Sequence, residues 1–280
     1  MKSSQFSFST SDSLELFGQS WLPERQPKAV INLVHGLGEH SGRYEHLGQF
    51  FSEEGFAVLA YDLRGHGQSE GRRGYTPSFD QLLNDISQFL EVSKQQYPDT
   101  PNILYGHSLG GLQVLKYIVQ NVPEILGAIV TGPLLRPAFE PPAVTLIAAK
   151  ILNKILPTFQ LSNEIDPEGL SHDEIVVQNY INDPLVHDKL TPRLAVEMLA
   201  TGEQTLKSAA QLQTPLLLMH GADDPITSSE ASQEFAEHAG SLCTFHLWEG
   251  LYHEIHNEPV YEEVFQYELD WIEQLMAQTS

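Results

Sequence analysis

The sequence predicts an α/β fold, in which a mostly parallel sheet is covered by helices on both faces. Three observations predict it. The composition, 41% hydrophobic and 19% charged over 280 residues, is that of a globular chain with a sizeable core. Short apolar runs, several ending in Gly, suit strands buried on both faces. Segments with apolar residues at helical spacing separate these runs, and such alternation is typical of a parallel sheet.

The elements follow in a regular order along the chain. Residues 5–10 and 14–21 alternate apolar and polar side chains and are expected to pair as an N-terminal hairpin. Buried strands are expected at 29–36, 57–62, 102–106, 126–132, 215–221 and 244–250. Helices are expected at 43–55, 79–97, 112–122 and 259–278.

The alternation breaks once, between about residues 132 and 212. This stretch contains an apolar helical segment at 143–156 and several shorter helical stretches, but no convincing buried strand. We expect three parts: a core in residues 1–132, an inserted helical cap or lid in 133–212, and the rest of the core in 213–280. An insertion that leaves a strand end lies where open parallel sheets have their sites. The alternative is a helical decoration of the core.

Charge and composition exclude several classes of partner. The formal net charge of −22 would repel nucleic acid and strongly anionic membranes. Cys243 is the only cysteine, so no internal disulfide can form. The first residues contain no apolar run suited to a signal peptide, and the 143–156 segment is too short and charged to span a bilayer. We therefore expect a cytoplasmic protein, with peripheral contact to membranes as an open alternative.

The turn after the third buried strand carries a candidate nucleophile. Gly106-His107-Ser108-Leu109-Gly110 matches G-x-S-x-G, and it lies between an expected strand and an expected helix, as that motif requires. The glycines permit a sharp turn, and the start of a helix favours a developing negative charge near Ser108. The alternative is a glycine-rich turn with an incidental serine.

A nucleophilic serine needs a base, and the base needs a carboxylate to orient it. In this architecture the chain order is Ser, acid, His. The strand at 215–221 is followed by Asp223 and Asp224, and the loop after the last strand contains His253 and His256. The order 108, then 223 or 224, then 253 is therefore correct.

Acyl transfer also needs N–H donors for an oxyanion. Leu109 follows the nucleophile and supplies one, and Leu37, in the glycine-rich loop after the first buried strand, is our candidate for the second. A dinucleotide-binding loop is the alternative for this segment. It fails because Ser41 occupies the place of the third glycine.

Several stretches together resemble the monoglyceride lipase and lysophospholipase family of α/β-hydrolases over nearly the whole chain. They are HGLGEHSGRYEHL, YDLRGHGQSEGRRGY, GHSLGG, DPLVH, HGADDPIT and GLYHEIHNE. The resemblance implies an α/β-hydrolase fold with a mobile amphipathic cap. It implies Ser108 as nucleophile, His253 as base and Asp224 as the acid.

The same resemblance assigns a head-group site. Family members hold the glycerol of the substrate through a Glu, an Arg and a His that match Glu39, Arg43 and His256 here. Pro225 departs from the pattern, since relatives often carry Arg or another polar residue at that place. The partner implied is a small, monoacylglycerol-like lipid, and no cofactor is expected.

Three other features have simpler interpretations. His253 and His256 have i, i+3 spacing without a recognised ligand set, so no metal site is expected. Asp62, at a strand end, is expected to hydrogen-bond the backbone. The 143–156 helix, with Lys150 and Lys154 on one face, fits either packing onto the core or lying on a lipid surface.

These observations predict a serine hydrolase of single-chain lipid esters, with monoacylglycerol as substrate and an acyl-enzyme on Ser108. A lysophospholipase or a broad carboxylesterase with the same triad is the alternative. A choline head group would need an aromatic cage, and no cluster near the head-group residues supplies one. A non-catalytic binding protein would lack a triad member, and none is missing.

Overall fold

The computed structural model describes residues 2–279. Within them lies a sheet of eight strands in the order β1-β2-β4-β3-β5-β6-β9-β10. β1 and β2 form the expected antiparallel hairpin, β2 is also antiparallel to β4, and the remaining neighbours are parallel. The bounds are β1 Lys2–Ser9, β2 Glu15–Leu22, β3 Val30–Val34, β4 Ala57–Tyr61, β5 Asn102–His107, β6 Gly127–Thr131, β9 Leu216–Gly221 and β10 Cys243–Trp248.

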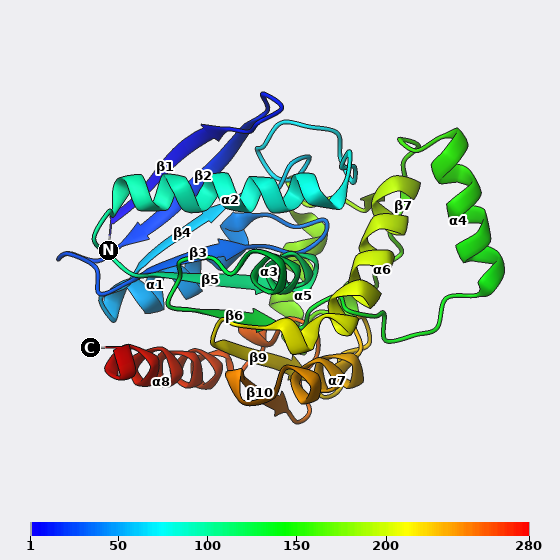
Figure 1. Cartoon of the computed structure of the whole chain (residues 1–280). Coiled ribbons are helices and arrows are strands. Elements are labelled where there is room, and N and C mark those ends of the chain that lie inside the picture. The colour runs from blue at the N-terminus through cyan, green and yellow to red at the C-terminus, as the bar shows by residue number, and fades with distance from the viewer. Residues whose placement is uncertain (1, 280) are drawn as a thin grey trace.

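Helices cover both faces of this sheet, so the predicted fold class is confirmed (Figure 1). One apolar layer joins the sheet to α2 Phe79–Gln96, α3 Ser108–Asn121 and α7 Ser229–Ala239. The other joins it to α1 Glu45–Glu53, which follows the short turn η1 Ser41–Tyr44, and to α8 Tyr261–Thr279. Every residue of β3 to β6 and of β9 is buried, which explains their nearly continuous apolar sequences.

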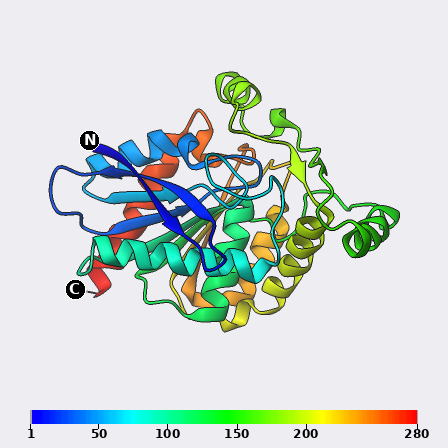
Figure 2. The same cartoon turned by 90° about the horizontal axis from the view of Figure 1, so that it is seen from above.

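The segment between β6 and β9 gathers beyond one end of the sheet (Figures 1 and 2). It contains α4 Ala143–Ile155, α5 Glu174–Asn182 and α6 Pro192–Lys207, with the short turns η2 Pro167–Gly169 and η3 Ala209–Gln211. Its strands, β7 Leu161–Ser162 and β8 Lys189–Leu190, have two residues each and are exposed or half-buried. α6 also packs on the core layer through Leu194 and Leu206.

α4 is the element of this segment that lies farthest from the sheet, and it packs against α6 (Figure 1). None of its residues is buried, and Val144, Ile147, Ile151 and Ile155 are each more than half exposed. Across the described residues, no helix combines the length and the apolar character needed to span a membrane.

Candidate active site

Ser108 occupies the turn between β5 and α3, at the carboxyl edge of the parallel strands. Its φ of +54° is in the left-handed region, which a non-glycine residue adopts only when the surrounding structure enforces it. A side chain at Gly110 would collide with the carbonyl oxygen of Val34, so the glycine lets α3 pack against β3. The strained turn holds Ser108 above the sheet at the first turn of a helix.

The structure brings Asp224, and not Asp223, to His253. The Oδ2 atom of Asp224 accepts a hydrogen bond from Nδ1 of His253 at 2.7 Å, and both side chains are buried. Asp223 is exposed and contacts this loop through its backbone N–H, which donates to the carbonyl of Leu251. Only Asp224 can therefore orient the imidazole.

The carboxylate of Asp224 is held by its own loop. Its Oδ1 atom accepts the backbone N–H groups of Ile226 and Thr227, and its Oδ2 atom accepts the Thr227 hydroxyl at 2.8 Å. Nε2 of His220 lies 3.0 Å from Oδ2, and its Nδ1 contacts the Ser232 hydroxyl. The sequence alone assigns this second imidazole no role, because its partners become visible only when β9 is placed beside α7.

The charges of this site favour a cation on His253. Burial opposes a charge on the ring, but Asp224 outweighs burial and raises the pKa of His253. Burial and the neighbouring His253 lower the pKa of His107 to about 3, and burial with His107 holds the pKa of His256 well below its ordinary value. The ring centroid of His107 lies 4.7 Å from that of His253 and 4.7 Å from that of His256. Neutral neighbours thus leave the developing positive charge to His253.

A small cavity lies at this point. Its lining includes Ser108, His253, Leu37 and Glu39, together with residues of the segment between β6 and β9. Its free volume of about 20 Å³ accommodates roughly one water molecule. The backbone N–H of Leu109 lies in the first turn of α3, where such groups lack intrahelical acceptors. An oxyanion formed beside Ser108 would lie in this cavity, next to the first turn of α3.

Buried side chains fix the loop that contains Leu37. The ring of His35 contacts the carbonyl of Gly36 through Nδ1, and its Nε2 accepts the N–H of Leu63 at 2.9 Å. The Glu39 carboxylate accepts the N–H of Gly36 at 2.6 Å. Asp62 caps the next turn by accepting the N–H and hydroxyl of Ser41, so its expected backbone role is confirmed.

Glu39 and Arg43 are already paired within the protein. Arg43 donates a hydrogen bond to Glu39 at 2.8 Å and forms a bidentate ion pair with Glu254 at 2.5 and 2.7 Å. Tyr44 donates its hydroxyl to Glu39, and the ring of Tyr180 stacks 4.8 Å from the Arg43 guanidinium. Glu254 and Tyr180 are not predicted from the sequence, since neither motif spacing nor composition links them to Arg43, which lies 137 or more positions away.

His256 differs from these two residues. Its side chain is fully buried, and within residues 2–279 neither ring nitrogen has a hydrogen-bond partner. The ring stacks on Tyr44 with centroids 4.8 Å apart and meets His107 edge-on. Since an unpaired buried polar group costs about 1–3 kcal/mol, this imidazole is a group that a bound hydroxyl could satisfy.

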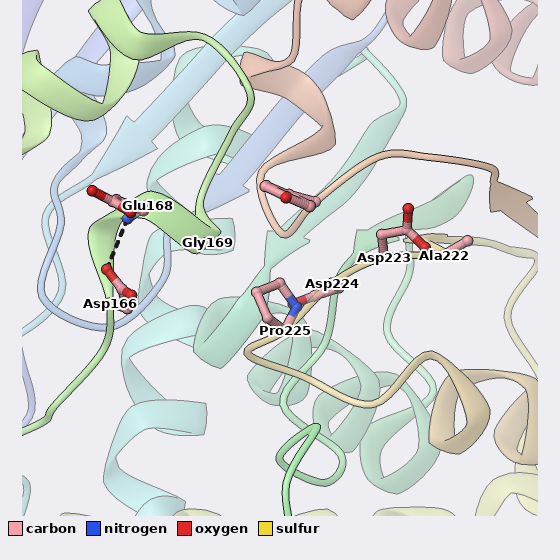
Figure 3. A pocket seen from close by; sticks show the side chains of 8 residues that line it. Asp166, Glu168, Gly169, Ala222, Asp223, Asp224 and Pro225 are labelled. Atoms are coloured by element: carbon pink, nitrogen blue, oxygen red, sulfur yellow. Dashed lines mark hydrogen bonds between the residues drawn. The ribbon is translucent and has the colours of Figure 1, made fainter.

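A larger hollow of about 600 Å³ is lined in part by Asp224. Figure 3 shows it between the segment of Asp166, Glu168 and Gly169 and the loop of Asp223 and Pro225. Ser108 and His253 do not line it. The smaller cavity is therefore the candidate substrate site, because Ser108 and His253 line it.

Comparison with known proteins agrees with this arrangement. A family model described as "Serine aminopeptidase, S33" matches residues 25–260. A monoacylglycerol lipase of Mycolicibacterium smegmatis is 32% identical over 96% of both chains, and a phospholipase of Bacillus subtilis is 32% identical over 88% of this chain and 95% of its own. An uncharacterized abhydrolase domain-containing protein of Dictyostelium discoideum is 43% identical over 98% of this chain, which spans 29% of that relative's length.

Among solved structures, a monoacylglycerol lipase of Paleococcus ferrophilus is similar with a TM-score of 0.83 and 34% identity. The similarity covers 98% of this chain and 100% of that one. Fold and site thus define an α/β-hydrolase with a serine centre, and the predicted resemblance is confirmed. The chain belongs to the family described as serine aminopeptidase S33, and within it is similar to the monoglyceride lipases. It is a carboxylic ester hydrolase.

Proposed function

We propose that this hydrolase cleaves monoacylglycerols to glycerol and fatty acid through an acyl-enzyme on Ser108. The observation that carries the proposal is the buried 2.7 Å contact between Asp224 and His253 beside a cavity that also holds Ser108. The monoacylglycerol lipases among its relatives support the choice of substrate.

The proposed reaction forms an acyl-enzyme and then hydrolyses it. His253 takes the proton of Ser108 through Nε2, because Nδ1 is engaged by Asp224. The Ser108 oxygen attacks the ester carbonyl, and the backbone N–H groups of Leu37 and Leu109 stabilise the oxyanion. His253 then gives the proton to the departing glycerol oxygen. A water molecule, deprotonated by His253, attacks the acyl carbon; the bond to Ser108 breaks, the fatty acid leaves, and His253 returns the proton to the Ser108 oxygen.

The head-group site gathers around His256. We propose that the glycerol hydroxyls meet the unpartnered ring of His256 and the carboxylate of Glu39, which lines the cavity. Arg43 holds Glu39 in place through the 2.8 Å contact and neutralises its charge. An ester without free hydroxyls would leave the buried His256 ring unpaired, which disfavours its transition state.

The segment 133–212 serves as the proposed cap between the two parts of the core, residues 1–132 and 213–280. The cavity at Ser108 is too small for an acyl chain, so part of the cap must move before a lipid can enter. α4 exposes Ile147 and Ile151 on a helix that also carries Lys150 and Lys154, which suits transient contact with a lipid surface. The cytoplasmic location stays a prediction.

A lysophospholipid is the alternative substrate, favoured by the relative named as a phospholipase. A choline head group is bound best by the open face of an aromatic ring. Tyr180 is the aromatic side chain that lines the cavity, and the Arg43 guanidinium already lies over its ring. This arrangement supports glycerol over choline.

A substrate panel tests the proposal. Mono-, di- and triacylglycerols, lysophosphatidylcholine and p-nitrophenyl esters are compared in wild type, His256→Ala and Glu39→Ala. We expect monoacylglycerols to be cleaved fastest by wild type, and both variants to lose far more activity on them than on p-nitrophenyl esters. Equal losses of activity on both substrates would mean that His256 and Glu39 support the fold instead of binding glycerol. Faster cleavage of lysophosphatidylcholine than of monoacylglycerol by wild type would favour the lysophospholipase alternative.

A further inference from the structure

Residues 169–172, here called the strap, run beside the loop that carries His253. The strap belongs to the proposed cap, whereas the loop belongs to the core. The N–H of His253 donates to the carbonyl of Gly169 at 3.4 Å, and the N–H of Glu254 donates to the carbonyl of Leu170 at 2.8 Å. The backbone of the proposed base is therefore hydrogen-bonded directly to the cap.

The carboxylate of Glu258 hydrogen-bonds both the strap and the loop that carries His253. Its side chain is fully buried. Oε1 accepts the N–H of Tyr252 at 2.7 Å, and Oε2 accepts the N–H of His172 at 3.0 Å and the hydroxyl of Ser171 at 3.4 Å. The His172 ring also contacts this carboxylate and stacks on Tyr252 with centroids 3.7 Å apart. One carboxylate thus joins two segments that lie about 80 residues apart.

The strap also touches the loop of the proposed acid. A Cβ at Gly169 would come within 2.6 Å of Cγ of Pro225, so the glycine leaves room for the proline ring to pack against the strap (Figure 3). Pro225 directly follows Asp224. The proline that departs from the family pattern therefore has a packing partner in the strap.

We propose that Glu258 is a positioning residue for His253. It fixes the N–H of Tyr252, the residue before His253, while the strap fixes the N–H of His253 itself and Asp224 fixes its ring. Carboxylate acceptors make strong hydrogen bonds to backbone N–H groups in a buried site, so the backbone next to His253 is held firmly. The inference rests on the proposed function of Ser108 and His253. It also requires that the cap movement that admits substrate leaves the strap in place.

Glu258→Gln tests the proposal, because it keeps the shape but replaces one acceptor oxygen with an NH₂ group that faces N–H donors. We expect kcat on a monoacylglycerol to fall about 10- to 100-fold with little change in KM, as for a misplacement near 1 Å. The rate of labelling by a fluorophosphonate should fall by a similar factor, since it needs the same base. The low-field proton resonance of the His253–Asp224 contact should shift or broaden.

Glu268→Gln is the matched control, since Glu268 is equally buried and its carboxylate contacts Tyr105 of β5 instead of the His253 loop. It should keep wild-type kcat, labelling rate and resonance. All comparisons are made at a temperature where circular dichroism shows each variant folded. Should Glu258→Gln not fold, Ser171→Ala replaces it, because it removes the hydroxyl bonds to Glu258 and to the carbonyl of Asn257.

The outcomes separate the two proposals. A folded Glu258→Gln or Ser171→Ala variant with wild-type kcat, labelling rate and resonance would overturn the positioning role, even with a lowered Tm. A wild-type protein that a fluorophosphonate does not label at Ser108 would instead overturn the proposed function. A decrease in kcat with little change in KM, together with an altered resonance, supports the positioning role.

Discussion

A buried carboxyl group on α8 makes the stability of this fold depend on pH. Glu268 is fully buried in the apolar layer between the sheet and α8, where its Oε1 atom accepts the hydroxyl of Tyr105 at 3.1 Å. Within the described residues, Oε2 has no partner. Burial raises the pKa of Glu268 to about 8, although the Tyr105 hydrogen bond acts in the opposite direction.

The sign and size of the effect follow from this pKa. Below about pH 4.5 the carboxyl is protonated in both the folded and the unfolded chain. Between pH 4.5 and about 8 the unfolded chain loses this proton while the folded protein keeps it, so the free energy of unfolding falls. The gap corresponds to about 5 kcal/mol in total, as an upper bound, because the fold can relax around an ionised group.

Glu268→Gln removes this titration and keeps an oxygen for Tyr105. Urea unfolding at pH 5 and at pH 8.5 measures the free energy of unfolding for both proteins. The variant should gain several kcal/mol relative to wild type between the two pH values. Glu263→Gln, on the exposed face of the same helix, should show no such change. A difference between Glu268→Gln and wild type that is the same at both pH values would refute a protonated Glu268.

Three further predictions concern the site and the cap. Asp224→Asn should lower kcat about 10⁴-fold, as when a catalytic histidine loses its orienting carboxylate, while exposed Asp223→Asn should lose less than about tenfold; the reverse ranking would contradict the assignment. The acid limb of kcat/KM should have its midpoint above pH 6.5, because the pKa of His253 is raised and its protonation removes the base; a midpoint below 6.5 would contradict this. Replacing exposed Ile147 and Ile151 by Asn should weaken sedimentation with zwitterionic vesicles while p-nitrophenyl ester hydrolysis stays unchanged, and unchanged sedimentation would remove α4 from membrane contact.

The sequence predicts this fold well because its central strands are buried on both faces. β3, β4, β6 and β9 lie within the apolar runs that predict them, β5 extends one residue beyond its run to His107, and each helix pattern corresponds to a helix of the structure. Within the segment 133–212 the sequence predicts helices without their arrangement. The structure supplies this arrangement: α6 packs on the core, whereas α4 is exposed.

The site is only partly accessible from sequence. The turn at Ser108 is predicted because its strand, glycines and helix are contiguous. The choice between Asp223 and Asp224 needs more than local sequence, because either could follow β9 and only the loop geometry directs one of them to His253. Glu254 lies 211 residues from Arg43, and Glu258 binds the strap across 86 residues, so neither contact leaves a trace in motif spacing.

The central claim is that monoacylglycerol turnover passes through an ester on Ser108. The most direct test is an acid quench during turnover of a saturated monoacylglycerol, followed by peptide mapping by mass spectrometry. The account predicts the acyl mass on the peptide that contains Ser108 in wild type, and its loss in Ser108→Ala together with a drop in kcat of about 10⁶-fold. An acyl group on another residue, or undiminished turnover by Ser108→Ala, would contradict it.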